Sequence, residues 1–176
     1  MSLSDLDLVI LAKAARDSAA FDALVRRHQA PLRAFLIRLT GDPAGADDIA
    51  QEALIKAYRG LEGFRGGSSF RSWLFAIAIR EAAIDRRRKA AVTRAEAAAG
   101  ADKEDDAGAP SLSLDLRAAL SRLSPEERAA ALLCDAAGFS HAEAAAAMAA
   151  PLGSVKTYLL RARERQHHRE LLGEQA

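Results

Sequence analysis

A stretch in the middle of the chain is poorly suited to a packed core, and it constrains every fold that this sequence can adopt. Residues 90–115 contain six acidic and two basic side chains, no aromatic residue and few large apolar ones. Such a composition buries too little apolar surface to offset the entropy that is lost on ordering. We therefore expect a flexible acidic linker over residues 90–112, which joins a first domain (residues 1–89) to a second (residues 113–176).

The residues on either side of this linker favour helices throughout. Half of all residues are apolar, but many of these are alanines, which favour helix and bury little surface. No alternation of apolar and polar residues persists long enough to predict a strand. The sequence therefore predicts an all-α protein made of two small helical domains.

Several functional classes find no support in the sequence. The single cysteine, Cys134, excludes an intrachain disulfide and suits a reducing compartment. The apolar run near the N-terminus follows acidic residues and is too short to cross a bilayer, so we expect a cytoplasmic chain without membrane insertion. No nucleotide-binding loop, metal-ligand cluster or nucleophile motif is present, and adjacent histidines such as His167 and His168 point in different directions on a helix. We expect no enzymatic activity, no cofactor and no metal.

Caps and breakers divide the first domain into helices. A stripe of Leu6, Val9, Ile10 and Lys13 marks the first helix. A second helix begins at Ser18, and Pro31 fits the first turn of a third helix that ends at Gly41. The next helix turns one face inward, with Ile49, Ala53, Ala57 and Leu61. After the breaker GGSS at residues 66–69, a long helix is expected from about Phe70 to Arg88.

The second domain carries the pattern of a helix-turn-helix. Two of its helices begin at capping boxes, Ser124 with Glu127 and Ser140 with Glu143. A short Gly-containing turn joins the second of these to a long helix, for which Ser154 is the predicted N-cap. Three apolar residues share one face of that long helix and should pack inward: Val155, Leu159 and Ala162.

The remaining faces of this last helix are rich in positive charge. From Ser154 to Arg169 there are five basic residues and one acidic residue, Glu164. This distribution suits a helix in the major groove, with its N-terminal residues at base edges and its cations at phosphates. The alternative is an ordinary amphipathic helix with a solvated basic face. We favour DNA binding, because a capped helix and a turn precede the basic helix.

A Gly-Ser loop, aromatics and arginines form a second candidate surface for nucleic acid. Four of the nine aromatic residues lie within twelve positions: Phe64, Phe70, Trp73 and Phe75. Five basic and two acidic residues follow between Arg80 and Lys89. An unstacked base could lie on an aromatic face beside these cations. For most of the aromatics a core position is favoured, because Trp73, Ile77 and Ile84 lie at helical spacing. The arginines are less easily explained in that way.

Four polar residues cluster in the first turns of the helix that follows Gly41: Asp47, Asp48, Gln51 and Glu52. Acidic side chains near a helix N-terminus are stabilised by the helix dipole, which is a sufficient explanation. A docking face for a basic partner helix is the other interpretation. The residues alone leave both interpretations open.

Two long segments together are similar to a known family. Residues 41–89 resemble the second conserved region of bacterial extracytoplasmic-function (ECF) sigma factors, and residues 123–171 resemble their fourth region. The resemblance covers both domains in the order of the family, with a short linker between them. It implies a protein that recruits core RNA polymerase to a promoter.

The resemblance assigns roles to individual residues. The core polymerase would be bound by Asp47, Asp48, Gln51 and Glu52, on the clamp helices of its largest subunit. The melted −10 element would be captured by Ser68, Phe70, Arg71, Trp73, Arg80, Arg86 and Arg87. The −35 element would be read in the major groove by Ser154, Lys156, Thr157, Tyr158, Arg161 and Arg163.

Some positions depart from the family pattern. Arg80 and Glu81 occupy the candidate positions of an Asn that is common in the −10 helix. An acid that faces DNA is unfavourable, so we expect either that Glu81 points elsewhere or that the promoter contact differs. Tyr158 stands where an Arg is common, which bears on −35 specificity. Alanines replace the usual Ile and Leu in the first helix of the helix-turn-helix, which predicts a thin core.

The resemblance also implies a cognate anti-sigma factor, inserted between the two domains or wrapped around them. A flexible linker would let the domains close on this inhibitor and spread on polymerase, and its acids could shield the DNA-binding surfaces. Two other classes stay open. A stand-alone helix-turn-helix regulator would leave the aromatic and arginine segment unused, and an adaptor that binds only proteins would have no promoter-dependent effect.

Overall fold

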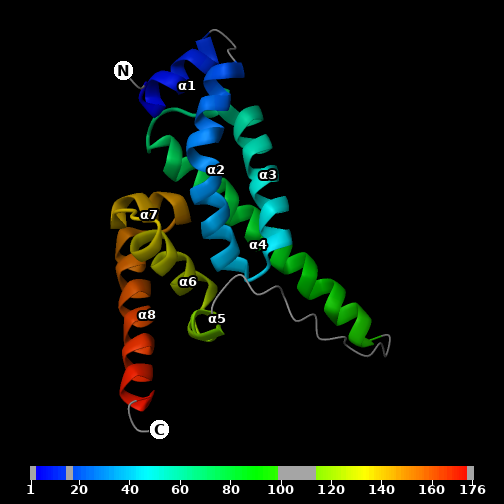
Figure 1. Ribbon diagram of the computed structural model, residues 1–176, viewed down its shortest axis with the longest axis vertical. Coiled ribbons are helices and arrows are strands. Elements are labelled where there is room, and N and C mark those ends of the chain that lie inside the picture. Colours follow the sequence, from blue (N-terminus) through cyan, green and yellow to red (C-terminus); the bar gives the residue numbers. More distant parts are fainter. Residues whose placement is uncertain (1–2, 15–17, 99–113, 174–176) are drawn as a thin grey trace.

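The computed structural model describes residues 3–14, 18–98 and 114–173, and within these ranges every regular element is a helix. The helices form two domains, which confirms the predicted fold class (Figure 1). The acidic side chains between residues 99 and 113 lie outside the described residues, as do the side chains of His167 and His168. No helix in the described part of the chain is long and apolar enough to span a membrane.

The first domain consists of four helices. They are α1 (Asp5–Ala14), α2 (Ser18–Thr40), α3 (Pro43–Gly60) and α4 (Phe70–Ala98), with a short 3-10 turn at Leu61–Gly63. Helix α2 packs against α1 and α3, and α4 crosses behind them and projects beyond α3 (Figure 1). The predicted inward face of α3 is confirmed, because Ile49, Ala53, Ala57 and Leu61 are all buried.

The predicted break at Pro31 is wrong, because α2 is one continuous helix with Pro31 inside it. A proline removes one helical hydrogen bond and crowds the preceding turn. Here the same face of the helix is buried on both sides of the proline, by Leu24 and His28 before it and by Leu32 and Phe35 after it. Continuous packing of this stripe outweighs the local cost.

The predicted face of α1 is also partly wrong. Val9 is buried as expected, but its buried neighbour is Leu8, and Leu6 and Ile10 are more than half exposed. Helix α1 is held by polar contacts as well: Asp5 accepts hydrogen bonds from Arg27 and faces the ring of His28 at 2.8 Å. These contacts, which come from a distant segment, set the rotation of α1.

Helix α4 begins at Phe70, as predicted, but continues to Ala98 rather than ending near Arg88. Residues 90–98, which the sequence assigns to the linker, are therefore helical, and all of them are exposed. Their alanines favour helix even without a core to pack against, and a long helix that is already nucleated extends at little cost.

The second domain consists of short helices around a small core. They are α5 (Leu114–Ser121), α6 (Pro125–Ala131), α7 (His141–Met148) and α8 (Leu152–Gly173). Both predicted capping boxes are confirmed: Ser124 with Glu127 begins α6, and Ser140 with Glu143 begins α7. The core is rich in alanine, as the sequence predicts, and its largest fully buried side chains are Leu133 and Val155.

Helix α6 continues into a π-helical turn, Leu132–Ala136, that the sequence does not predict. The N–H of Ala137 donates to the carbonyl of Leu132, and Gly138 follows with φ +69°. Glycine adopts this left-handed conformation without strain. The turn brings Phe139 back toward the core, where its N–H donates to the carbonyl of Leu133.

The turn between α7 and α8 differs from prediction in one detail. Ala149 ends α7 in a left-handed conformation, and α8 begins at Leu152. The N–H of Ser154 donates to the carbonyl of Pro151 at 3.0 Å, so Ser154 lies inside the first turn of α8. The prediction of Ser154 as N-cap is therefore wrong, because the proline starts the turn earlier.

The two domains contact each other directly. Helix α4 of the first domain packs along α7 of the second, and α2 contacts the π-helical turn (Figure 1). Arg128 on α6 donates to the carbonyl of Leu39 on α2 at 3.2 Å. We call this arrangement, in which the two domains touch, closed. It joins parts of the chain that are far apart in the sequence.

Candidate nucleic-acid interface

Helix α8 presents the basic surface that its sequence predicts. Val155, Leu159 and Ala162 are buried, with at most 2% of each residue exposed, which fixes the rotation of the helix. Lys156, Thr157, Arg161 and Arg163 are consequently exposed, whereas Ser154 and Tyr158 are half-buried. The arrangement leaves a row of cations on a helix whose N-terminal end follows a tight turn, as a major-groove reader requires.

Not every cation on α8 is free to meet phosphate. Arg163 forms an ion pair with Asp135 of the π-helical turn at 3.1 Å. Arg165 donates to the carbonyl of Arg122 and pairs with the buried carboxylate of Glu127 at 3.0 Å. Arg165 therefore anchors α8 to the start of α6, a role that the sequence does not indicate.

Helix α4 carries the second basic surface. Arg80, Arg86 and Arg87 are exposed, as a strand-binding surface requires. Ile84, placed in the core by its spacing, is 53% exposed and lies among these arginines. That placement is therefore wrong, because the helix extends past the end of the first-domain core.

Glu81 points away from the exposed arginine face. Its carboxylate accepts a hydrogen bond from the Lys56 ammonium of α3 at 2.7 Å. This hydrogen bond raises the pKa of Lys56. The acid that departs from the family pattern is thus used to hold α3 against α4, one of the two outcomes that the sequence left open.

The aromatic residues near the Gly-Ser loop form a cluster rather than an open platform. The ring of Trp73 lies 5.1 Å from that of Phe64 and 5.8 Å from that of Phe70, between ring centroids. Phe64, Phe70 and Phe75 are buried, which confirms the favoured interpretation. Trp73 and Ser68 are half-buried. Of these four rings, that of Trp73 is the one that stays partly exposed.

Arg71 has an unexpected position. It comes directly after Phe70 in the candidate −10 segment, but its guanidinium reaches the second domain. It donates a hydrogen bond to the carbonyl of Ala137 and lies 4.1 Å from the ring centroid of Phe139. Nothing in the local sequence signals this contact, which joins residues 66 positions apart.

The acidic face of α3 is open to solvent. Asp47, Asp48, Gln51 and Glu52 are all exposed and lie within two turns. Arg33 of α2 binds Asp47, and this hydrogen bond lowers the pKa of the Asp47 carboxyl. Glu52 pairs with Lys56 at 3.5 Å, one turn along the helix. Two of the three carboxylates of this face are therefore already paired with cations of the chain itself.

Another contact that the sequence does not reveal holds the start of α3. Lys89 on α4 donates to the carboxylate of Asp42 at 2.9 Å, and Asp42 also accepts from the N–H of Gly45 as the N-cap of α3. Both bonds lower the pKa of Asp42, the backbone bond more strongly. In the described part of the chain, no group of three or more His, Cys, Asp or Glu is arranged to hold a metal ion.

The two domains match separate family models, in the order of the chain. Residues 24–93 match Sigma-70 region 2, and residues 113–165 match Sigma-70, region 4. The chain is 38% identical over 169 residues to the ECF RNA polymerase sigma factor SigM of Mycobacterium tuberculosis, which covers 92% of this chain and 82% of SigM.

Two solved structures have a similar fold. One is the sigma factor RpoE from Bartonella quintana in complex with the anti-sigma factor NepR, at 33% identity and TM-score 0.69 over 82% of this chain and 92% of that chain. The other is CnrH in complex with the cytosolic domain of CnrY, at 26% identity and TM-score 0.73 over 98% and 99% of the two chains. The basic faces of α4 and α8, the acidic face of α3 and these similarities agree: the chain belongs to the ECF group of sigma-70 family RNA polymerase sigma factors.

Proposed function

We propose that this chain binds core RNA polymerase through α3 and directs it to promoters through α4 and α8. The observation that carries the proposal is the presence of two separate basic helix faces, one in each domain, together with an exposed acidic face. A simple duplex-binding protein needs only one of these surfaces. A factor that reads two promoter elements while bound to polymerase needs all of them.

Helix α8 would lie in the major groove of the −35 element. Lys156, Thr157 and Arg161 are exposed on its first turns and are suited to base edges and phosphates. Tyr158, which is half-buried, and Ser154 would line the edge of this surface. Arg163 would add a phosphate contact after leaving Asp135.

Helix α4 and the loop before it would hold the melted −10 strand. Arg80, Arg86 and Arg87 supply exposed cations, and Ser68 supplies a loop hydroxyl. Opening a duplex costs a few kcal/mol per unstacked base, and contacts made only with the single strand offset that cost. The cluster of Phe70 and Trp73 would shape the pocket into which a base is drawn, and Arg71 would bind the adjacent phosphate.

The acidic face of α3 would dock on a basic surface of the polymerase. Asp47, Asp48, Gln51 and Glu52 offer carboxylates and an amide to such a surface. Arg33 covers one carboxylate of this face at present and would compete with the polymerase for Asp47. The chain would act in the cytoplasm, as a binding factor without chemistry of its own.

An anti-sigma factor would control this activity. RpoE and CnrH, which share the fold, were solved with the anti-sigma factor NepR and with the cytosolic domain of CnrY. A partner of this kind would bind across the two domains and cover the surfaces of α4 and α8.

The test is run-off transcription with sigma-free bacterial core polymerase on a library of genomic fragments. The wild-type chain should produce new, defined start sites. The double variant Lys156→Ala and Arg161→Ala should lower the yield of transcripts from these start sites at least about tenfold, because each phosphate or base contact contributes to affinity. Arg94→Ala, at the far end of α4, removes a similar exposed charge and should leave the start sites unchanged.

A second pair of variants separates polymerase binding from DNA binding. Asp48→Arg should abolish co-elution with core polymerase, whereas Asp22→Arg, an exposed acid of α2, should not. If the wild-type chain gave no start sites and did not co-elute with core polymerase, the proposal would be overturned. A stand-alone DNA-binding regulator would then be favoured.

A further inference from the structure

The guanidinium of Arg71 contacts two groups of the second domain and one aromatic ring of its own domain. The guanidinium donates to the carbonyl of Ala137, lies 4.1 Å from the ring centroid of Phe139 and lies 5.8 Å from that of Phe75 in its own domain. The rings of Phe75 and Phe139 lie 4.9 Å apart. Arg71 thus covers an aromatic pair whose two members belong to different domains.

The acceptor of this hydrogen bond, the carbonyl of Ala137, lies at the end of the π-helical turn. Carbonyls at the end of a helix have no partner further along the helix and carry partial negative charge, which attracts a cation. Ala137 lies at such an end, immediately before the left-handed Gly138. The Ala137 carbonyl is therefore free to accept from Arg71, and Phe139 follows two residues later with its ring turned toward α4.

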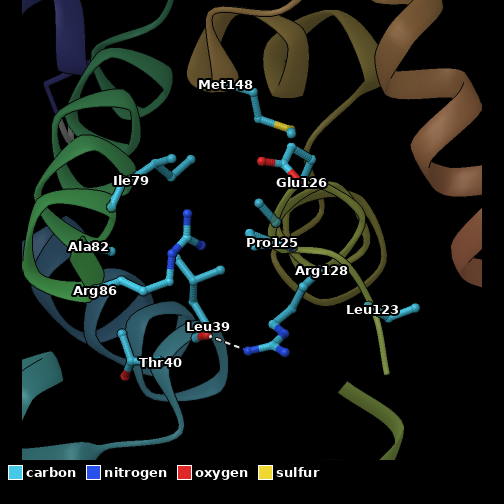
Figure 2. A pocket seen from close by; sticks show the side chains of 12 residues that line it. Leu39, Thr40, Ile79, Ala82, Arg86, Leu123, Pro125, Glu126, Arg128 and Met148 are labelled. Carbon is cyan, nitrogen blue, oxygen red and sulfur yellow. Dashed lines mark hydrogen bonds between the residues drawn. The ribbon is translucent and has the colours of Figure 1, made fainter. Parts of the chain in front are cut away.

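Two open pockets border the seam between the domains. One cavity of about 340 Å³ lies between α4 and α6, and a second of about 270 Å³ lies beside Arg71, between α2 and the π-helical turn. Figure 2 shows Arg86 and Arg128 bordering the first cavity from opposite domains. Burial and the charge of Arg86 lower the pKa of Arg128. Like charges that face each other across an interface weaken it.

We propose that Arg71 is a latch used by two competing partners: the second domain when the chain is closed, and the promoter strand when it is open. One guanidinium cannot cover Phe139 and hold a phosphate of the strand at the same time, so closure and strand binding exclude each other. The inference rests on the proposed −10 role of Arg71. It predicts that the free chain binds single-stranded DNA weakly because it is closed, without any inhibitor.

The first measurement is the distance between the domains in the full chain. Spin labels at Glu62→Cys and Glu164→Cys, both exposed positions, in a Cys134→Ser background report on closure. The wild type should give a dominant short, narrow distance population and a minor one of longer distances. Arg71→Ala and Phe139→Leu should each raise the share of longer distances, about five- to tenfold in the ratio of open to closed, the size expected for one charged hydrogen bond with a cation–π contact.

The matched control is Arg65→Ala. Arg65 is an exposed arginine in the same segment, six residues before Arg71, and its removal changes the net charge equally. It should leave the distances unchanged. Phe139→Leu keeps an apolar side chain in the second-domain core, and unchanged helical content by circular dichroism verifies that the domain stays folded.

The second measurement is the affinity for a short fluorescein-labelled oligothymidine. The two variants should open the chain equally, but only Phe139→Leu keeps the guanidinium that binds the strand. Phe139→Leu frees Arg71, and if about a tenth of the wild type is open it should bind about four- to fivefold more tightly, because the predicted rise in the ratio of open to closed leaves roughly half of the molecules open. Arg71→Ala lacks the phosphate contact and should bind more weakly than Phe139→Leu by several-fold.

The outcomes separate the latch from the proposed function. Unchanged distances in both variants would overturn the latch and leave the −10 role of Arg71 intact. Opening in both variants, with equal affinities for the oligothymidine, would instead overturn the −10 role of Arg71 and with it the competition.

Discussion

The two domains have the same fold class but are stabilised by different kinds of side chain. In the first domain the core is built on aromatic rings, and Phe35, Phe64, Phe70 and Phe75 are all buried. Alanines are buried in both domains, but among the described residues of the second domain Phe139 is the one buried aromatic. A buried aromatic removes several times more apolar surface from water than a buried alanine does.

This difference teaches that the second domain depends more on features outside its core. Two capping boxes hold the starts of α6 and α7, and Arg165 ties α8 to Glu127. Phe139, a buried aromatic of this domain, packs partly against the first domain. The smaller core is thus supplemented by polar bonds at helix ends and by the neighbouring domain.

The largest expected effect comes from removing one leucine from each core. Leu133→Ala and Leu74→Ala both empty a site that is fully buried, and each should cost about 2–5 kcal/mol of the free energy of unfolding. In the second domain this loss should unfold the domain while the first stays folded. Urea titrations should then show an earlier transition by circular dichroism and an unchanged one by fluorescence of Trp73, the single tryptophan.

Leu74→Ala is the matched comparison, because it weakens the first domain. It should therefore shift the unfolding transition seen by Trp73 fluorescence to lower urea concentration. If Leu133→Ala shifted both signals together, the two domains would unfold as one unit, and the contrast between them would be wrong.

A smaller effect is expected from the loss of one helix cap in each domain. Ser140→Ala removes the acceptor for the N–H of Glu143, and Ser69→Ala removes the acceptor for the N–H of Ser72 at the start of α4. Each change should cost about 1 kcal/mol. Because α7 is short and alanine-rich, hydrogen exchange of the second domain should rise throughout after Ser140→Ala, but only locally after Ser69→Ala. Equal local effects would contradict a greater dependence of the second domain on its caps.

The smallest effect is a difference in acid sensitivity. His28, buried between Asp5, Arg27, Phe70 and Arg71, has a pKa below its ordinary 6.5, chiefly because of burial. Since the unfolded chain takes up this proton at higher pH than the folded chain does, stability is full above pH 6.5 and falls as the pH drops below it. The first domain should therefore weaken in mild acid, and His28→Gln should flatten the dependence.

The second domain should respond only at lower pH. The pKa of Glu143 is lowered from 4.5, first by its hydrogen bond with the backbone of Ser140. Its contribution is present above about pH 4.5 and is lost as the pH falls further. Urea midpoints by Trp73 fluorescence and by circular dichroism at pH 7.5, 5.5 and 4.0 should separate the two responses, whereas parallel changes would count against this assignment.

Local signals in the sequence predicted the parts of the fold that local forces determine. Ser124 and Ser140 stand beside their capping partners, and the buried face of α8 follows from helical spacing alone. The predictions failed where contacts between distant segments determine the structure. Helix α2 continues through Pro31 because both of its halves pack on one core. Ile84 is exposed because that core ends before it.

The candidate site divides in the same way. The exposed cations of α4 and α8 could be predicted, since charge on an amphipathic helix faces outward. The partners of Glu81, Lys89, Arg71 and Arg165 could not, because each lies in a distant segment of the chain, 25 to 66 positions away. Their positions follow from tertiary packing that no single stretch of sequence encodes.

The π-helical turn at Leu132–Ala136 has a consequence for changes in chain length. A π-helical turn accommodates one residue more than an α-helical turn does. Deleting one residue there should restore an ordinary helix and rotate everything that follows by about 100°. Phe139 would then leave Phe75, and the reading helix would be redirected relative to the first domain. The one extra residue of this turn is thus expected to determine how the second domain is oriented relative to the first.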